Sequence, residues 1–253
     1  MGSSQISPTV KKWFIWSGPL SLAPFVAALV LLARMVPPPR PSWSAERIAE
    51  VYAGNQTGIL VAAFVAIVSI ALWANWAGVV IAECRSVETS SPFLTYTLTI
   101  FASAMFLITL SCPVLLGFGA YRAGEVPPEI TRLINDAFWF AAEYPYSPFA
   151  AFMVVLAIVV FSDKRDTPVF PRWVGYFCLW CALLMFPGGM LAFFKTGPFA
   201  YDGLLAFYVL AGAYTTFTIA LSVVMHKQMN RDAARERGSR PEVAAAEEPV
   251  VAR

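Results

Sequence analysis

Six long stretches of this chain carry almost no charge, and they constrain the fold more than any other feature. Each holds roughly 20 or more mostly apolar residues, enough for a helix to cross a hydrocarbon core about 30 Å thick. They lie at about 15–36, 57–82, 93–118, 138–161, 173–194 and 201–225. Lipid offers no hydrogen-bond partners to an open backbone, so each stretch must be helical. The sequence predicts an all-α, polytopic membrane protein built as a six-transmembrane-helix bundle.

The composition agrees with this fold class. Of the 253 residues, 58% are hydrophobic and only 13% are charged, whereas soluble domains carry roughly 25% charged residues. The net charge of +2 is too small to suggest a nucleic-acid partner. Arg outnumbers Lys and Ala is abundant, a bias typical of GC-rich bacterial genomes. We therefore expect a multi-pass protein of the bacterial inner (cytoplasmic) membrane.

The basic residues predict the orientation, because cytoplasmic loops are enriched in Lys and Arg. With the N-terminus inside, 12 of the 18 Lys and Arg residues fall on the cytoplasmic side. We therefore expect both termini to be cytoplasmic. Trp13, Trp16 and Trp173 then fall at the inner interface, where amphipathic rings are favoured.

Three segments follow from this topology. Residues 1–14 form a cytoplasmic N-terminal segment, 15–226 form the six-helix transmembrane domain, and 227–253 form a charged cytoplasmic tail, helical at first and then largely disordered. The first span could also be a signal peptide. It is long for one and is followed by a poor cleavage site, so we expect an uncleaved signal-anchor.

Two features are expected in the outer loops. Ser44 should cap a short helix, and Pro128 should begin an amphipathic helix that runs into the fourth span. An internal repeat is a further alternative, because spans two–three and four–five are similar hairpins with Pro113 and Pro187 near their outer ends.

The segment AFWFAAEYPYSPF (137–149) places an acid in an apolar run. Glu143 lies about one and a half turns inside the outer end of the fourth span. Acids inside the membrane are rare, although their cost falls near the boundary. Asp136 lies seven residues earlier on the same helical face. Pro145 and Pro148 remove backbone donors and should kink the helix.

Two interpretations of Glu143 follow. In the functional one, Glu143 forms the floor of an outward-facing cavity, with Trp139, Tyr144 and Tyr146 on its walls. In the structural one, Glu143 is an interfacial acid that reaches water or pairs with a base such as Lys195.

The segment FPGGMLAFFKTGPFAYDG (186–203) joins the last two spans. Pro187 and the two glycines after it permit a kink or close helix approach. This segment has two interpretations. It forms a second wall of the cavity, or it is a tight hairpin in which Lys195 pairs locally with Asp202. The candidate ligand-binding residues are Glu143, Asp136, Trp139, Tyr144, Tyr146, Lys195, Tyr201 and Asp202.

Motifs for established chemistries are missing from the sequence. Cys178 and Cys181 have CxxC spacing, but they lie in an apolar span where thiols are deprotonated with difficulty. His226 is the only histidine, which excludes bis-His haem and histidine-rich di-iron sites. No Walker A, GxGxxG, GxSxG or HExxH motif occurs. We expect no metal and no cofactor, and no catalytic residue is assigned.

Three functions stay open. The leading hypothesis is a non-enzymatic protein that binds or translocates a small amphipathic molecule, either alone or as one subunit of a larger system. The second is a membrane enzyme that uses Glu143 or Asp136 as general acid or base on a lipid-soluble substrate. The third is a structural scaffold or assembly factor whose tail holds a partner. The expected partners are the bilayer, the amphipathic ligand, and either another protein or a second copy of the chain.

Overall fold

A computed structural model describes residues 7–88 and 91–246, with residues 235–246 described by their backbone alone. The described residues form helices and connecting segments, and no strand occurs among them. The elements are α1 (Pro8–Ala27), η1 (Ala28–Leu32), α2 (Ala45–Gly54), α3 (Gln56–Arg85), α4 (Phe93–Tyr121), α5 (Pro128–Glu143), α6 (Tyr146–Ser162), α7 (Arg172–Met185), α8 (Pro187–Met190), η2 (Leu191–Phe193), η3 (Leu204–Val209) and α9 (Leu210–Ala246).

Among the described residues, six helical segments are long and apolar enough to cross a membrane, which is the number that the sequence predicts. They are Pro8–Leu32, Gln56–Arg85, Phe93–Tyr121, Pro128–Ser162, Arg172–Phe193 and Leu204–Ala234. Three boundaries differ clearly from the sequence prediction, and one of them is the end of the last segment, which reaches Ala234 rather than about 225. The first helix begins earlier, at Pro8, because the Ser7 side chain caps it by accepting a bond from the Val10 backbone N–H. The fourth segment begins at Pro128 and is broken into two helices, α5 and α6.

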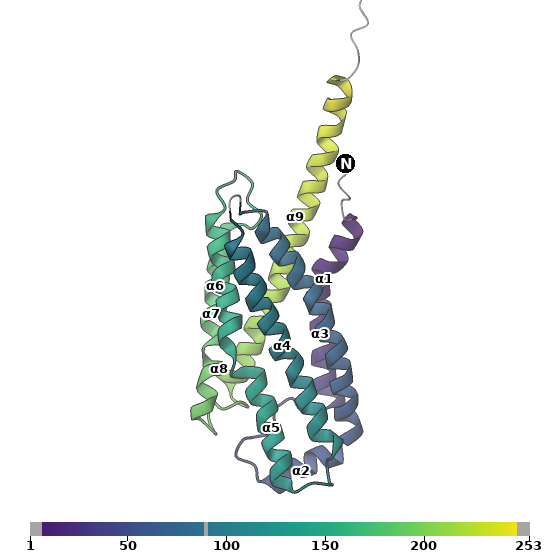
Figure 1. Cartoon of the computed structure of the whole chain (residues 1–253), viewed down its shortest axis with the longest axis vertical. Helices are drawn as coiled ribbons and strands as arrows, with labels where there is room; N and C mark the ends of the chain where they lie inside the picture. Colours follow the sequence, from purple (N-terminus) through teal and green to yellow (C-terminus); the bar gives the residue numbers. More distant parts are fainter. Residues whose placement is uncertain (1–6, 89–90, 247–253) are drawn as a thin grey trace, which may run out of the picture.

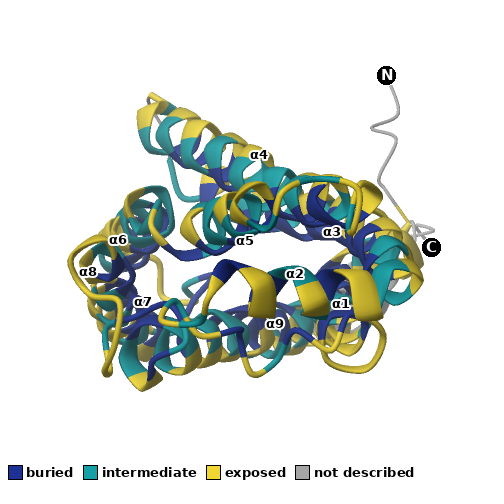
Figure 2. Ribbon diagram, turned by 90° about the horizontal axis from the view of Figure 1, so that it is seen from below, coloured by how far each residue is buried: buried dark blue, intermediate teal, exposed yellow. Residues whose placement is uncertain are grey.

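The six segments form a closed ring in chain order. The helices pack side by side as α1 on α3, α3 on α4, α4 on α5 and α6, α6 on α7, α7 on α9, and α9 on α1, as the end-on view in Figure 2 shows. The start of α1 and the C-terminal part of α9 lie at one end of the molecule, and α2 lies at the opposite end with the start of α5 (Figure 1). We call these the terminal end and the α2 end.

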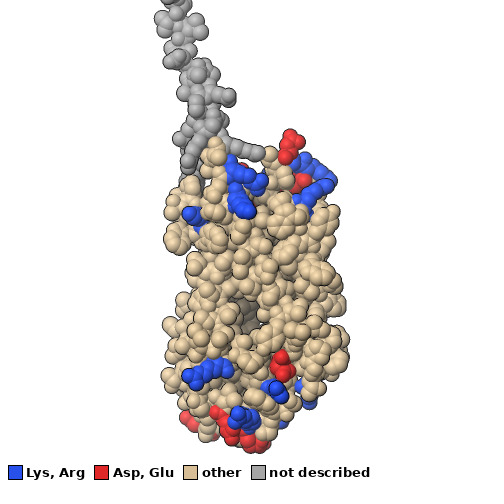
Figure 3. Space-filling view, turned by 180° about the vertical axis from the view of Figure 1, so that it is seen from behind, with Lys and Arg blue, Asp and Glu red and all other residues tan. Residues whose placement is uncertain are grey.

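The distribution of charge divides the surface into three zones. On the face seen in Figure 3, the Lys, Arg, Asp and Glu side chains gather at the two ends and leave an uncharged band between them. Large apolar side chains such as Phe64, Ile100 and Leu107 are exposed on the helices that cross the molecule. A water-soluble monomer rarely exposes so much contiguous apolar surface, so the band is typical of a multi-pass membrane protein.

Two hydrophobic clusters fill the ring. The cluster nearer the terminal end is built around Trp76 and Phe217, and the cluster nearer the α2 end is built around Tyr52 and Trp139. In the first, the Trp76 indole N–H donates to the Ser222 hydroxyl at 2.9 Å and ties α3 to α9. The candidate site lies between the two clusters.

The two helix starts predicted at Ser44 and Pro128 are confirmed. The Ser44 hydroxyl accepts a bond from the Arg47 backbone N–H at 3.3 Å and caps α2. Pro128 is the first residue of the amphipathic helix α5, which runs directly toward α6. The two halves of the suggested repeat differ at their prolines, since α4 is continuous through Pro113 whereas α7 ends before Pro187.

The tail begins as a continuation of the last helix. The structure continues α9 to Ala246, within the tail over 227–253 that the sequence predicts to be helical at first and then largely disordered. Residues 247–253 lie outside the described part of the chain.

Candidate functional site

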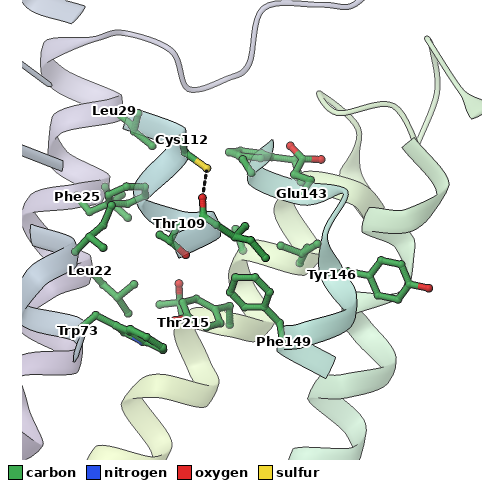
Figure 4. A pocket seen from close by; sticks show the side chains of 18 of the residues that line it. Leu22, Phe25, Leu29, Trp73, Thr109, Cys112, Glu143, Tyr146, Phe149 and Thr215 are labelled. Carbon is green, nitrogen blue, oxygen red and sulfur yellow. Dashed lines mark hydrogen bonds between the residues drawn. The ribbon is translucent and has the colours of Figure 1, made fainter. Parts of the chain in front are cut away.

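A cavity of about 190 Å³ lies inside the ring, between the two hydrophobic clusters. It is far larger than the roughly 10–15 Å³ that one water molecule needs on the same kind of measure. Most of its lining is aliphatic or aromatic, and Figure 4 shows Glu143 and Trp73 at opposite ends of the labelled side chains. We call it the Glu143 cavity; its lining includes Phe25, Val26, Leu29, Trp73, Thr109, Cys112, Trp139, Glu143, Tyr146, Phe149, Phe207, Leu210, Ala211 and Thr215.

Glu143 is the one acidic residue in this lining, and its carboxyl group has no fixed partner. The residue is 3% exposed. Neither carboxyl oxygen makes a hydrogen bond to the described residues, and none of the ion pairs among them includes Glu143. Burying an isolated carboxylate is costly unless a proton, a donor or a cation neutralises it. Glu143 is therefore placed to accept a hydrogen bond or to pair with a cation.

The position of Glu143 follows from the proline two residues later. Glu143 is the last residue of α5, and Pro145, which has no N–H, breaks the helix before α6 begins at Tyr146. The Tyr146 backbone N–H instead donates to the Tyr144 carbonyl at 2.8 Å. The prediction of a kink at Pro145 is thus confirmed as a full break. Pro148 lies within the first turn of α6, where a missing N–H is tolerated.

A second break lies against the first. A methyl group added to Gly188 would lie 2.6 Å from the Glu143 carbonyl oxygen, closer than real side chains approach. Gly189 has no room for a side chain either, because the Tyr146 ring fills that space. Pro187 and these two glycines therefore form α8 where the main chain must approach the α5–α6 break closely.

Trp139 forms the wall one turn before Glu143. Its indole stacks on Tyr201, with centroids 6.0 Å apart and planes 13° apart, and meets Phe207 edge-on at 5.5 Å. The indole N–H is buried and has no hydrogen-bond partner among the described residues. The cavity lining therefore presents an unpaired donor on Trp139 as well as the unpaired carboxyl group of Glu143.

A buried polar network lies behind Trp139, toward the α2 end. The Tyr201 hydroxyl donates to Asp136 at 2.9 Å, the Asn135 amide donates to Tyr201 at 3.2 Å, and the Tyr52 hydroxyl donates to Asn135 at 3.4 Å. Burial raises the pKa of Tyr201, and the Asp136 carboxylate raises it further, so the hydroxyl stays protonated. The network joins α2, α5 and the segment before η3.

The other predicted residues have different places. Tyr144 is 45% exposed and packs on Phe140, outside the cavity lining. Tyr146 contributes to the lining, but Figure 4 shows its hydroxyl pointing away from the other labelled side chains. Lys195 is exposed, and no ion pair with Glu143 or Asp202 is found among the described residues. The structure therefore does not bring Lys195 to Glu143.

Asp202 lies beside the cavity rather than in its lining. It is half-buried, and this burial raises its pKa, although the Arg40 guanidinium acts in the opposite direction. Of the eight predicted residues, Glu143, Trp139 and Tyr146 line the cavity, and Asp136 and Tyr201 support it through the network.

Several lining residues carried no usable signal in the sequence. Phe25, Val26 and Leu29 come from the first span, and Leu210 and Ala211 come from the last. Such residues are ordinary in any membrane helix, and only the closure of the ring brings the two helices together.

The cysteines occupy packed positions. Cys178 and Cys181 are buried in the cluster around Trp76. Across the part of the chain that the structure describes, no group of three or more His, Cys, Asp or Glu side chains is placed to hold a metal ion.

Comparisons of the chain with protein-family models, curated protein sequences and solved structures find no match.

Proposed function

We propose that the protein is a multi-pass protein of the bacterial inner membrane, with both termini in the cytoplasm, that binds a small amphipathic molecule in the Glu143 cavity. The excess of Lys and Arg at the terminal side of the spans supports the orientation. The ring of six apolar helices and the uncharged band support the membrane location.

One observation carries the binding proposal. The lining of a cavity with mostly aliphatic and aromatic walls includes the carboxyl group of Glu143 and the indole N–H groups of Trp73 and Trp139, none of which has a partner among the described residues. Ligand pockets typically combine apolar walls with a few polar groups that fix the ligand's orientation. An amphipathic molecule would cover the walls with its apolar part and satisfy Glu143 with its polar part.

Filling the cavity tests this proposal. The protein, reconstituted in lipid nanodiscs, is titrated with 4-phenylbutanol, 4-phenylbutylamine and 4-phenylbutyrate, and binding is followed by tryptophan fluorescence. Ala142→Phe places a ring in the cavity lining, whereas Ala23→Phe makes the same change at an exposed position of α1 that is outside the lining. We expect at least one probe to bind the wild type and Ala23→Phe but not Ala142→Phe. Equal binding to all three proteins, or to none, would refute the proposal.

An enzyme is the second candidate, because a carboxyl group without a fixed partner can exchange a proton with a bound substrate. Analysis of the same incubations by mass spectrometry separates the two functions. A binding protein returns the probe unchanged, whereas an enzyme converts its substrate and loses that conversion in Glu143→Ala.

A further inference from the structure

The route from the Glu143 cavity to the α2 end is filled by buried side chains. Tyr201 covers the face of Trp139, and Asn135 and Tyr52 continue the hydrogen-bonded network behind it. Asn135 and Tyr52 are fully buried and Tyr201 is nearly so. The predicted outward-facing opening therefore has a packed polar layer across it.

The cavity reaches the surface at a different place. Val26 of α1 belongs to the lining and is 48% exposed, so this wall of the cavity is also part of the molecular surface. Leu210 and Ala211 of α9 line the cavity and are half-buried. Figure 3 shows a hollow at mid-height in the uncharged band. An opening in this band faces lipid when the band lies in a membrane.

The two helices beside this opening share an unusual feature. Each is joined to a π-helix: η1 follows directly after α1, and η3 comes directly before α9. Leu29 of η1 and Phe207 of η3 both line the cavity. Nearer the terminal end, α1 and α9 are in contact, where the Trp16 and His226 rings lie 5.8 Å apart. π-helical turns recur at functional sites because they locally depart from regular helical packing.

The chemistry inside the cavity selects the polar group of the ligand. The Thr109 hydroxyl and the Cys112 thiol already donate to the backbone carbonyls of Met105 and Ile108. Glu143 offers two acceptor oxygens, and none of the other lining residues carries a basic side chain. An ammonium group supplies both the donors and the positive charge that this carboxylate lacks, and aromatic faces attract it as well.

We propose that the cavity takes a lipid-soluble amine, which enters sideways from the bilayer between α1 and the η3–α9 segment and places its ammonium group on Glu143. This inference rests on the proposed binding function and adds the ligand class and the route. The ammonium–carboxylate pair has no net charge, which limits the cost of holding it in a low-dielectric site.

The ligand class is tested with three probes that share one apolar body. In nanodiscs, we expect 4-phenylbutylamine to bind the wild type roughly tenfold or more tightly than 4-phenylbutanol, since hydrogen bonds to charged groups exceed neutral ones. Glu143→Gln should abolish this preference while leaving the binding of the alcohol nearly unchanged. If the wild type binds amine and alcohol equally, the inference is wrong. If, in that case, Ala142→Phe still loses the binding of the alcohol, the proposed binding function stands although the inferred amine preference fails.

The route is tested by narrowing the opening. The double variant Val26→Phe/Ala211→Phe adds bulk at both sides of the opening. Leu20→Phe is the control, because Leu20 of α1 lies outside the lining and, at 47%, is about as exposed as Val26. Stopped-flow fluorescence should show 4-phenylbutylamine associating about tenfold or more slowly with the double variant, and at the wild-type rate with Leu20→Phe. An unchanged rate in the double variant would overturn lateral entry.

Discussion

At the residue scale, the molecule is defined by a carboxyl group that its own helix break leaves inside the protein. Glu143 ends α5 because Pro145 cannot continue it, and the neighbouring main chain of α8 fits only because Gly188 has no side chain. The pattern of acid and prolines was visible in the sequence. That no basic side chain among the described residues pairs with Glu143 was not visible, because it depends on where Lys195 lies in three dimensions.

Replacing Gly188 by Ala tests this close approach. The added methyl group would lie 2.6 Å from the Glu143 carbonyl oxygen, and a main-chain oxygen cannot rotate away as a side chain can. We expect a loss of about 1–3 kcal/mol in the free energy of unfolding, measured as a lower melting temperature in detergent. Gly212→Ala is the control, because a methyl group there meets nothing within 4 Å. Equal melting temperatures for the two variants would contradict this packing.

Asp163 provides a pH-dependent test in the loop between α6 and α7. Its carboxylate accepts bonds from Arg165 Nε at 2.8 Å, from Arg165 Nη2 at 2.7 Å and from the Val169 backbone N–H at 3.0 Å. The Arg165 hydrogen bonds lower the pKa of Asp163, although its burial opposes them. Because the pKa of Asp163 is lower in the folded state, the ionised carboxylate stabilises the fold at pH values above the ordinary Asp pKa of about 3.9. This stabilisation is lost as the pH falls through the lowered pKa.

We therefore expect Asp163→Asn to cost about 1–3 kcal/mol at pH 7. The difference in melting temperature between variant and wild type should shrink as the pH falls below about 4. Asp166→Asn, at an exposed position in the same loop, should melt like the wild type at every pH. A constant difference between pH 7 and pH 3 would argue against the Asp163–Arg165 clasp.

At the scale of the elements, breaks and π-helical turns matter more than helix lengths. The spans themselves were predictable from hydrophobic length. Ser7 and Pro128 start two of the helices early, and the last helix continues beyond the predicted end of its span. The π-helical turns η1 and η3 were not predictable, since the residues that form them are ordinary apolar ones. Their conformation depends on the neighbouring helices rather than on local propensity.

The network around Tyr201 should hold α2, α5 and the segment before η3 together. Tyr201→Phe removes the hydroxyl that donates to Asp136 and accepts from Asn135, and leaves the buried Asn135 and the half-buried Asp136 without this partner. We expect a loss of about 1–3 kcal/mol in the free energy of unfolding, again read from thermal melting. Tyr208→Phe is the matched control, because Tyr208 is exposed on η3. Equal melting temperatures for the two variants would contradict a stabilising role of the network.

At the scale of the whole molecule, the ring explains why so much of the site was hidden from the sequence. The closure of α9 on α1 places the first and last spans on the same cavity, although almost the entire chain separates them. The hydrophobic pattern specifies which segments cross the membrane. It does not specify which face of each helix points inward, because lipid-facing and core-facing residues are similarly apolar.

The orientation of the ring is a prediction at this scale. The excess of Lys and Arg on the loops at one side predicts that both termini are in the cytoplasm. Alkaline phosphatase, which is active only outside the cytoplasm, should be inactive when fused after residue 253 and active when fused after Gly124, in the α4–α5 loop. A green fluorescent protein fused at the same two places should show the opposite pattern. The reversed result would require the opposite orientation.

The most direct measurement of the central claim is to find where a bound ligand lies. A 4-phenylbutylamine that carries a photoreactive diazirine on its ring can be irradiated with the protein in nanodiscs and the labelled residues identified by mass spectrometry. The account predicts label on the cavity lining, at Trp139, Glu143 or Thr215, and its displacement by unlabelled 4-phenylbutylamine. Label confined to exposed residues of the uncharged band, such as Phe64 and Leu107, and unaffected by that competitor, would contradict it.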